Sequence, residues 1–302
     1  MKKSVPIIML AMAALFIVAL EFTRDDGAFN RDTFRNSANL SAGEAVVVGG
    51  ERAASLFLPS SYTQDEPVPL LLDLHGYGGE GLSHGMYTFM QSAADLRGMA
   101  YVAPNGLQDS AGSRFWNASS ACCNFGASQV SDVEYISDLI AEIASKVAID
   151  TSRIYLFGHS NGHFMSYKFA CSTKGVVTAI AGLAGAMDID LTQCAKNPTN
   201  VLHIHGTNDS TIQYEGGALL GNNYPSAQTS VGYWAQLNAC SAPTEKQIDL
   251  VQSMVGDETS QFAYTCEKGS VELWRINDGL HTPNLDQGFA LCTIDWFLTH
   301  RK

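Results

Sequence analysis

Positive charge is scarce in this chain of 302 residues. Its 18 lysines and arginines are outnumbered by 30 aspartates and glutamates, so the formal net charge is −12 at pH 7. No stretch is rich in lysine or arginine. Because a negative surface repels phosphate groups, this composition argues against a nucleic-acid partner, and we interpret the acidic balance as a contribution to solubility.

Paired metal-binding cysteines and internal repeats are also absent. No CxxC motif occurs, which leaves a metal site with little support. Hydrophobic residues make up 46% of the chain and charged residues 16%. That length and composition suffice for one large α/β domain with a sizeable core, and no second domain is required. We place this domain at residues 41–302.

One long apolar run stands near the start of the chain. Ile7–Leu20 contains no charge and follows Lys2 and Lys3, which is typical of a secretory signal. The run is short for a membrane span, which needs about 20 residues. We expect export, to the periplasm or out of the cell, with residues 1–20 as a signal peptide or, alternatively, as an uncleaved membrane anchor. Residues 21–40 are polar with scattered aromatics and are interpreted as a linker.

The most informative stretch is Arg153–Gly162. Ile154–Phe157 is apolar and partly β-branched, which predicts a buried strand. The next five residues, Gly158-His159-Ser160-Asn161-Gly162, match the pattern G-x-S-x-G, and the residues after them are compatible with a helix. A serine on a sharp turn between strand and helix projects its hydroxyl above the sheet, and the flanking glycines let the two backbones pass close to it. We interpret the stretch as a nucleophile elbow.

Strands and helices are predicted to alternate along most of the chain, after a hairpin formed by Glu44–Val48 and Arg52–Leu58. Such alternation indicates a mostly parallel sheet with helices on both faces. The expected strands are Leu70–Leu74, Met99–Ala103, Ile154–Phe157, Val176–Leu183, Thr199–His205 and Val271–Ile276, with weaker ones near Gln247–Val251 and Gln261–Tyr264. The expected helices are Met86–Arg97, Ser131–Val147, Ala227–Asn238 and Leu285–Thr299.

Residues suited to one reaction follow several of the predicted strands. Ligands of parallel sheets bind at the carboxyl ends of the strands. Those ends carry the turn His75–Gly79 and the side chains of Ser160, Asp209 and His281. The order Ser…Asp…His along the chain is the order found in α/β hydrolases, so we predict the α/β-hydrolase fold.

These residues meet the requirements of acyl transfer. A serine hydroxyl is a weak nucleophile until a base removes its proton, and we assign His281 that role for Ser160. Asp209 would hold the imidazole in the right tautomer and stabilise its charged form. The tetrahedral oxyanion needs donors already in place, and we assign these to the backbone N–H groups of Tyr77 and Asn161.

Alternatives remain open at two places. Asp278 is a rival to Asp209 as the acid, because it lies close to the proposed base in sequence. His203 and His205 alternate on one strand and therefore share a face, which is compatible with a metal pair. No third ligand is evident, so histidines that belong to the core or anchor a loop are favoured.

Three further side chains are candidates for the substrate pocket. His159 and His163 flank Ser160 too closely to reach round as its base, so we interpret them as residues that either support the triad residues or line the pocket. Trp116 lies on the long irregular loop Leu107–Val130, and long loops inside compact domains are usually functional. It is therefore either a pocket wall or a core residue.

The chain contains seven cysteines, which fits an oxidising compartment. An odd number leaves at least one of them unpaired or paired between chains. The predicted topology brings two pairs to the same edge of the sheet, so disulfides Cys171–Cys194 and Cys240–Cys266 are hypotheses. At most two of the remaining cysteines can pair with each other, and these are Cys122, Cys123 and Cys292.

As a set, these motifs resemble the polyhydroxybutyrate-depolymerase and feruloyl-esterase family of α/β hydrolases. The resemblance covers roughly residues 45–300 and rests on Leu74–Gly79, the loop with Trp116 and Cys122-Cys123, Gly158–Gly162, His205–Asp209 and His281. It implies an extracytoplasmic carboxylic-ester hydrolase that needs no metal or cofactor. The implied substrates are hydroxyalkanoate polyesters or hydroxycinnamate esters of plant polysaccharides, and the triad roles carry over onto Ser160, Asp209 and His281.

Two positions depart from the pattern of that family. His163 stands where the family usually has a second glycine after the elbow, and Thr282-Pro283-Asn284 lacks the tryptophan often found there. Both lie near the expected pocket and bear on substrate identity. An acyltransferase or a non-catalytic binding protein on the same fold are the alternative functions, and a peptidase is disfavoured because no extra propeller or lid domain is visible.

Overall fold

The computed structural model describes residues 45–192, 194 and 197–302. The predicted signal or anchor and the predicted linker lie outside the described residues. The main sheet contains ten strands. In chain order they are β1 (Ala45–Val48), β2 (Ala54–Phe57), β3 (Val68–Leu74), β4 (Ala100–Val102), β7 (Ile149–His159), β8 (Ala179–Leu183), β9 (Asn200–Gly206), β12 (Thr244–Ile248), β13 (Thr259–Tyr264) and β14 (Val271–Ile276).

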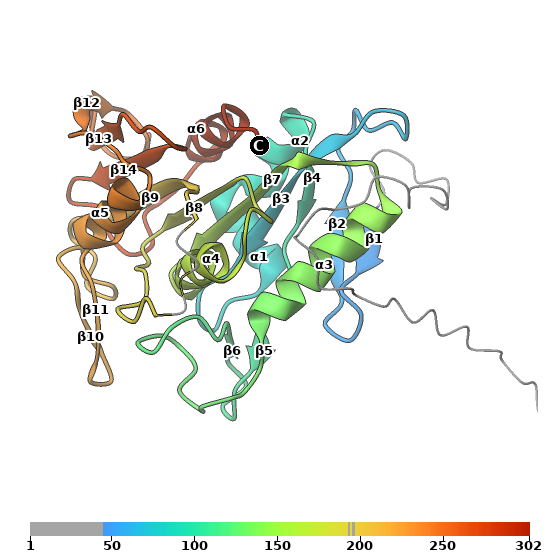
Figure 1. Cartoon of the computed structure of the whole chain (residues 1–302), viewed down its shortest axis with the longest axis horizontal. Coiled ribbons are helices and arrows are strands. Elements are labelled where there is room, and N and C mark those ends of the chain that lie inside the picture. Colours follow the sequence, from blue (N-terminus) through green and yellow to red (C-terminus); the bar gives the residue numbers. More distant parts are fainter. Residues whose placement is uncertain (1–44, 193, 195–196) are drawn as a thin grey trace, which may run out of the picture.

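The sheet has a parallel centre and antiparallel ends (Figure 1). Its strand order is β1-β2-β4-β3-β7-β8-β9-β14-β13-β12. Strands β4, β3, β7, β8, β9 and β14 run parallel, with β7 near the middle. Two short hairpins lie outside the sheet, β5 (Leu107–Gln108) with β6 (Arg114–Phe115) and β10 (Gly217–Leu219) with β11 (Asn222–Tyr224).

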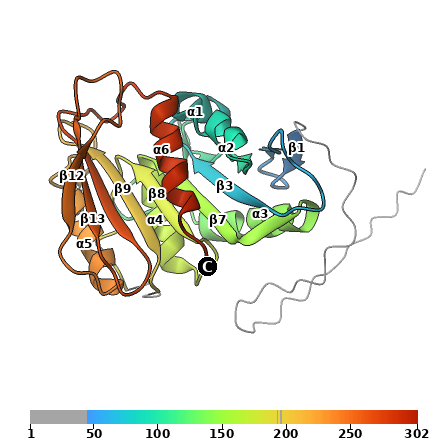
Figure 2. The same cartoon turned by 90° about the horizontal axis from the view of Figure 1, so that it is seen from above.

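Helices cover both faces of the sheet, so the core has two layers (Figure 2). Alternate residues of β3 point to opposite faces, and Leu70 and Leu72 therefore join one layer while Leu71 joins the other. The first layer lies under α3 (Asp132–Lys146), α4 (Asn161–Ser172) and α5 (Ala227–Leu237). The second lies under α1 (Gly81–Thr88), α2 (Met90–Leu96) and α6 (Gln287–Leu298). The predicted α/β-hydrolase fold is confirmed.

One predicted helix is wrong. The single helix expected at Met86–Arg97 is two helices, α1 and α2, which meet at Phe89. Phe89 has a φ of 57°, in the left-handed region, and this ends the first helix. Helix α3 is capped at its N-terminus by Ser131, whose hydroxyl accepts the N–H of Glu134.

Two disulfides lie at one edge of the sheet and a third lies in the long loop. Both hypothesised pairs, Cys171–Cys194 and Cys240–Cys266, are confirmed, with Cα separations of 4.2 and 3.8 Å. The adjacent residues Cys122 and Cys123 form a third disulfide, and Cys292 is free and exposed. Three disulfides in the described chain favour an oxidising, extracytoplasmic environment.

Candidate active site

The predicted elbow is present at the carboxyl end of β7. Strand β7 ends at His159 and helix α4 begins at Asn161, so Ser160 alone makes the turn. Its φ of 53° and ψ of −119° are a strained combination for a residue with a side chain. A Cβ atom on Gly158 would collide with the backbone of Gly162. Glycine is therefore required where the strand and the helix cross.

Ser160 lies in a hydrogen-bonded series with His281 and Asp209. The Nε2 atom of His281 is 3.0 Å from Ser160 Oγ, and its Nδ1 atom is 2.7 Å from Asp209 Oδ2. Asp209 follows β9 and His281 follows β14, so two neighbouring strand ends supply them. The rival acid Asp278 is exposed instead, and its backbone N–H binds the hydroxyl of Thr207. The structure thus brings Asp209, not Asp278, to the imidazole.

The carboxylate of Asp209 is buried and held by several donors. Its Oδ1 atom accepts the backbone N–H groups of Thr211 and Ile212, each at 2.8 Å. Its Oδ2 atom faces His281 and also lies 3.3 Å from the Nε2 atom of His205. Burial acts to raise the pKa of Asp209, but the hydrogen bonds from His205, His281 and Ile212 outweigh it and hold the pKa well below its usual range. Asp209 is therefore an anion at neutral pH.

The two assigned oxyanion donors lie on the segments that flank Ser160. The turn after β3 reaches the nucleophile, since a Cβ atom on Gly76 would sit 3.3 Å from the Cβ of Ser160. Tyr77 follows directly. Asn161 opens helix α4, where the first N–H groups have no partner within the helix. Neither N–H group takes part in a hydrogen bond within the described residues, so both are free to receive a ligand oxygen.

A buried network holds these two segments in place, and sequence reasoning missed it. The Asn161 side chain bonds both the N–H and the carbonyl of Trp116, at 2.7 and 3.0 Å. The indole N–H of Trp116 then donates to the carbonyl of His75 at 3.0 Å. His75 accepts the N–H of Gly106 through Nε2, which requires a neutral ring, and burial lowers the pKa of His75 to about 4. The only signal for this in the sequence is the asparagine directly after the serine.

The predicted pocket residues are not a pocket wall. Trp116 and His163 have 0% of their surface exposed, so neither is placed to touch a substrate and their substrate-binding assignments are corrected. For Trp116 the alternative of a core residue holds. His159 is 7% exposed and its Nε2 atom lies 3.0 Å from the carbonyl of His281. It stacks against His84 and supports the segment that carries the base. Burial lowers the pKa of His159 to about 3, so this ring is neutral.

Two exposed aromatic rings lie beside the proposed oxyanion donors instead. Tyr77 is 40% exposed and Phe125 is 45% exposed, and their rings meet edge to face with centroids 5.5 Å apart. The Tyr77 hydroxyl donates to Asp109 at 2.6 Å, which fixes its ring. Phe125 was missed although it lies only two residues after Cys123, because a single phenylalanine on an irregular loop forms no pattern of its own.

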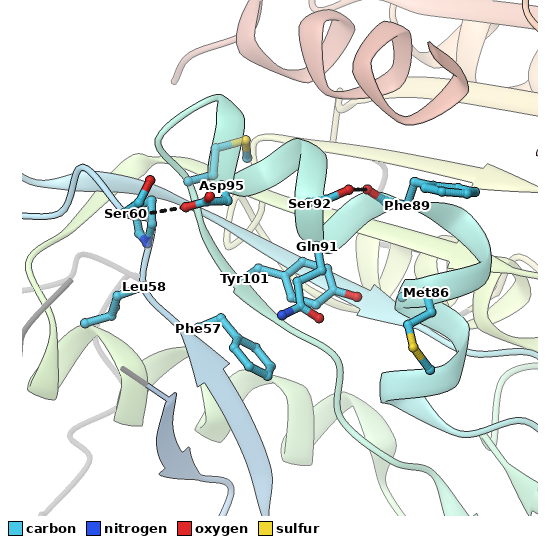
Figure 3. A pocket seen from close by; sticks show the side chains of 12 residues that line it. Phe57, Leu58, Ser60, Met86, Phe89, Gln91, Ser92, Asp95 and Tyr101 are labelled. Carbon is cyan, nitrogen blue, oxygen red and sulfur yellow. Dashed lines mark hydrogen bonds between the residues drawn. The ribbon is translucent and has the colours of Figure 1, made fainter. Parts of the chain in front are cut away.

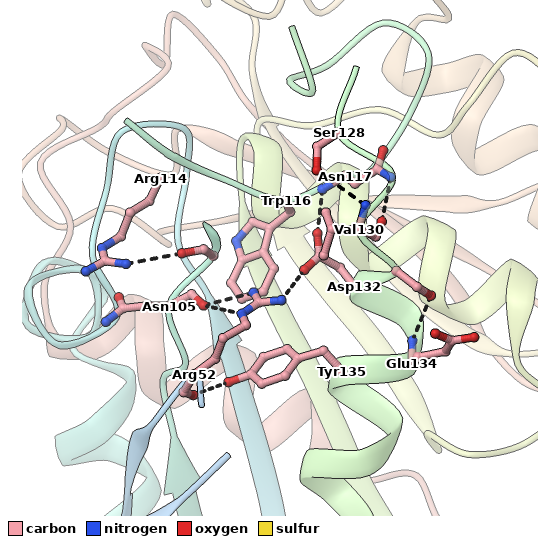
Figure 4. Close-up of polar contacts among 12 residues, drawn as sticks. Arg52, Asn105, Arg114, Trp116, Asn117, Ser128, Val130, Asp132, Glu134 and Tyr135 are labelled. Atoms are coloured by element: carbon pink, nitrogen blue, oxygen red, sulfur yellow. Dashed lines mark hydrogen bonds and ion pairs between the residues drawn. The ribbon is translucent and has the colours of Figure 1, made fainter. Parts of the chain in front are cut away.

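An arginine joins the long loop to the sheet (Figure 4). Arg52 pairs with Asp132 at 2.6 Å, and its guanidinium lies 3.8 Å from the ring centroid of Tyr135. The other oxygen of Asp132 accepts the N–H of Asn117 at 2.6 Å. Asn117 follows Trp116 in the chain. The Arg52–Asp132 ion pair therefore helps to hold Trp116, whose contacts support the two oxyanion donors.

Replacing Arg52 with methionine should lower the free energy of unfolding by about 3 kcal/mol, because Asp132 would remain buried without its partner. The matched control is Arg97→Met, which breaks the exposed pair with Asp295 at 2.6 Å. It should cost less than about 1 kcal/mol. Urea unfolding followed by circular dichroism measures both, and equal losses would contradict a structural role for Arg52.

An apolar groove of about 590 Å³ lies elsewhere on the molecule, beside α1 and α2 (Figure 3). It is lined by Phe57, Met86, Phe89 and Tyr101 among others. No residue of the Ser160 site belongs to its lining. We therefore assign the groove no part in the reaction.

The described residues offer no cluster of three or more His, Cys, Asp or Glu side chains able to hold a metal ion. His203 and His205, the pair considered above as possible metal ligands, bond to each other at 2.9 Å. Within the same residues, none of the helices has the length and apolarity that crossing a bilayer requires.

Comparison with known proteins relates this chain to a family of esterases. Residues 61–233 match the Phospholipase/Carboxylesterase family. The chain is 28% identical over 233 residues to feruloyl esterase B of Piromyces equi, covering 74% of this chain and 41% of that protein. It is 30% identical over 179 residues to a probable feruloyl esterase C of Aspergillus niger, covering 57% of this chain and 60% of that protein. The chain thus spans less than two thirds of these relatives.

Solved structures agree on the fold. The acetyl xylan esterase from Aspergillus awamori superposes with a TM-score of 0.60 at 14% identity, over 84% of this chain and 98% of that one. The family match covers more than half of the chain, and the resemblance to feruloyl esterases is confirmed by the relatives named above. This chain belongs to the Phospholipase/Carboxylesterase family of α/β hydrolases.

Proposed function

We propose that this protein is an exported serine carboxylic-ester hydrolase that cleaves hydroxycinnamoyl esters through an acyl-enzyme. The observation that carries the proposal is the series Ser160–His281–Asp209, with contacts of 3.0 and 2.7 Å at the carboxyl end of a parallel sheet. The named activities of the feruloyl esterases to which it is similar support the acyl class. Polyesters of hydroxyalkanoates remain the alternative substrate.

The first half of the reaction forms the acyl-enzyme. The Ser160 hydroxyl donates to His281 Nε2, while His281 Nδ1–H donates to Asp209. As Ser160 Oγ attacks the ester carbonyl, its proton passes to His281, and the carbonyl oxygen becomes an oxyanion. The imidazolium then gives that proton to the departing alcohol. Asp209 stays ionised throughout and stabilises the imidazolium.

The second half hydrolyses the acyl-enzyme. Water takes the place of the alcohol, His281 removes its proton, and the acid leaves as Ser160 is restored. In both halves the N–H groups of Tyr77 and Asn161 would bind the oxyanion. Losing one such donor typically slows a reaction roughly 10²–10³-fold. The bonds that anchor Asn161 and His75 to Trp116 keep both donors in place while charge develops.

The exposed rings of Tyr77 and Phe125 are proposed to bind the acyl group. They stand edge to face beside the proposed oxyanion donor of Tyr77, and a planar aromatic acid can pack against them. A short aliphatic acyl group would gain less from this contact. The pair therefore favours a hydroxycinnamate over acetate or butyrate.

Export and domain organisation complete the proposal. The three disulfides support an extracytoplasmic location. Residues 1–20 would direct export as a cleaved signal or a retained anchor, and residues 21–40 would link them to a single catalytic domain at 41–302. The substrate is the one proposed partner, and no metal or organic cofactor is needed for these steps.

A matched pair of methyl esters tests the acyl preference. Methyl ferulate should be cleaved with a higher kcat/KM than methyl butyrate. Phe125→Ala should lower that ratio up to about tenfold, since an aromatic contact is worth roughly 0.5–1.5 kcal/mol. Phe89→Ala is the control, because Phe89 is similarly exposed but lines the separate groove.

Other results would redirect the assignment. Preference for methyl butyrate together with erosion of a hydroxybutyrate polyester film would make the protein a polyester depolymerase. A new ester formed with an added alcohol, at the expense of free acid, would indicate an acyltransferase. A ferulate preference that Phe125→Ala leaves intact would contradict the aromatic site.

A further inference from the structure

A continuous row of buried polar side chains leads from helix α4 to Asp209. The Tyr167 hydroxyl lies 2.7 Å from His203 Nδ1, and His203 Nε2 lies 2.9 Å from His205 Nδ1. His205 Nε2 then lies 2.7 Å from the carbonyl of Ile212 and 3.3 Å from Asp209 Oδ2. Tyr167, His203 and His205 are at most 1% exposed, so water does not compete for these bonds.

The acceptors at one end set the direction of every bond in this row. A carbonyl and an ionised carboxylate can only accept, so His205 Nε2 must carry a proton. In a neutral ring Nδ1 is then an acceptor, and His203 must donate to it from Nε2. His203 Nδ1 is left to accept, and the rotatable hydroxyl of Tyr167 supplies the proton. Burial lowers the pKa of His203 well below its usual range, which agrees with a neutral ring.

The reverse arrangement is less favourable. A second proton on His205 would turn both imidazole bonds around, and the Tyr167 oxygen would become an acceptor. Its own O–H group would then have no partner among the described residues. A buried hydroxyl without a partner costs free energy, so the directed, neutral row is favoured.

We propose that His205 is a positioning residue of the triad, whose Nε2–H donates to the Ile212 carbonyl at 2.7 Å and faces Asp209 Oδ2 at 3.3 Å, and which is held in that tautomer by His203 and Tyr167. This inference rests on the proposed role of Asp209. The carboxylate accepts two backbone N–H groups on Oδ1 and His281 on Oδ2, and the Nε2–H of His205 lies 3.3 Å from Oδ2. The donor of His205 opposes rotation of the carboxylate, and Oδ2 thus stays aimed at His281.

The ring of His163 packs against the side of this row. This packing gives a structural reason for a histidine at the position where the family usually has a glycine. Its ring lies 4.7 Å from the rings of both Tyr167 and His203. Gly182 and Gly185 leave the space that it fills, because a Cβ on Gly185 would be 2.6 Å from the Cβ of His163. Its nitrogens have no hydrogen-bond partner among the described residues, so the ring acts as packing that excludes water.

Two substitutions at position 205 separate donation from packing. His205→Leu removes the donor, whereas His205→Gln can place an amide N–H near the position of Nε2. We expect His205→Leu to lower kcat about ten- to a hundredfold at unchanged KM, as for a lost hydrogen bond to a charged group. His205→Gln should recover most of that loss. Full kcat in a folded His205→Leu protein would overturn the proposal, and so would equal losses in both variants.

A more conservative substitution tests Tyr167, which lies at the end of the row farthest from Asp209. Tyr167→Phe keeps the ring and removes the hydroxyl that donates to His203 Nδ1, and it should lower kcat several-fold. Tyr155→Phe is its control, because that buried tyrosine loses a similar bond, to the carbonyl of His300 at 2.7 Å. Identical kinetics for the two tyrosine variants would contradict the role of Tyr167, even if the His205 variants fail to fold.

A ¹H NMR measurement tests the inference without relying on catalytic turnover. The proton on His281 Nδ1 should give a low-field ¹H resonance in the wild type and in His205→Gln. In His205→Leu it should move upfield or broaden, because its bond to Asp209 is weakened. An unchanged resonance would refute the inference. Absence of hydrolysis in the wild type would refute the proposed function alone, since this resonance still reports on the row.

Discussion

Replacing Ser160 with alanine should reduce ester hydrolysis on the order of 10⁵–10⁶-fold, while substrate binding changes little. The reason is geometric. Ser160 Oγ is the oxygen that lies 3.0 Å from His281 Nε2, and it stands at the apex of the turn between β7 and α4. Without it no acyl-enzyme can form, and only the oxyanion donors would remain to assist attack by water. Initial rates on methyl ferulate measure the loss.

The matched control for this prediction is Ser166→Ala. Ser166 is also buried and lies on the same helix, but its hydroxyl bonds the carbonyl of Gly162 at 3.0 Å. It should keep kcat within about threefold, because a single neutral hydrogen bond contributes only about 1 kcal/mol. A fluorophosphonate should label the wild type and Ser166→Ala once, and leave Ser160→Ala unlabelled. Hydrolysis that survives in folded Ser160→Ala would end the proposal of a serine esterase.

The elbow could be predicted from the sequence because the residues that form it are close together in the chain. Gly158, Ser160 and Gly162 lie within five residues, and the crossing of β7 and α4 by itself requires glycine at position 158. Glycine at position 162 is required by a more distant neighbour, because a Cβ atom there would collide with the carbonyl of Leu74 at the end of β3. Asp209 and His281 could be predicted because parallel topology brings strand ends to one edge. Distance along the chain did not matter there, since β9 and β14 are neighbours in the sheet.

The burial of Trp116 on the long loop could not be predicted in the same way. The sequence left Trp116 as either a pocket wall or a core residue, and it is fully buried because Asn161 binds its backbone and the His75 carbonyl accepts its indole N–H. Those contacts join segments far apart in the sequence. Arg52 and Phe125 escaped notice for the same reason, because an isolated arginine or phenylalanine has no local pattern.

The histidines illustrate a second limit of sequence reasoning. Alternation put His203 and His205 on one face of a strand, which was correct. Whether such a pair binds metal, fills a core or contacts a catalytic acid depends on which group the next loop presents. Here the turn after β9 presents Ile212 and Asp209, so the pair meets a carbonyl and a carboxylate.

Replacing Asp209 with asparagine should lower kcat about 10⁴-fold, although the shape of the site hardly changes. The two N–H groups of Thr211 and Ile212 require an acceptor, so the amide oxygen must take the place of Oδ1. The amide NH₂ then takes the place of Oδ2 and faces His281 Nδ1. It can only donate, so it forces the proton of His281 onto Nε2. In that tautomer His281 cannot accept the proton of Ser160.

The pH dependence of stability provides a second, independent test of the hydrogen-bonded, ionised Asp209 carboxylate. The folded pKa of Asp209 is held below its unfolded value of about 3.9, so its ionised form stabilises the fold above that pH. This stabilisation is lost as the pH falls through the folded pKa. The melting temperature of the wild type should therefore exceed that of Asp209→Asn most at neutral pH, and the difference should shrink below about pH 4.

Asp278→Asn is the decisive control, because Asp278 is the other acid near His281 in the sequence. Its side chain is exposed and bonds none of the triad residues, so its substitution should change kcat by less than about twofold. The reverse outcome, with Asp278→Asn inactive and Asp209→Asn active, would move the acid to the β14 loop. It would also remove the reason for a row of histidines that ends at Asp209, so one pair of variants tests the triad and its support together.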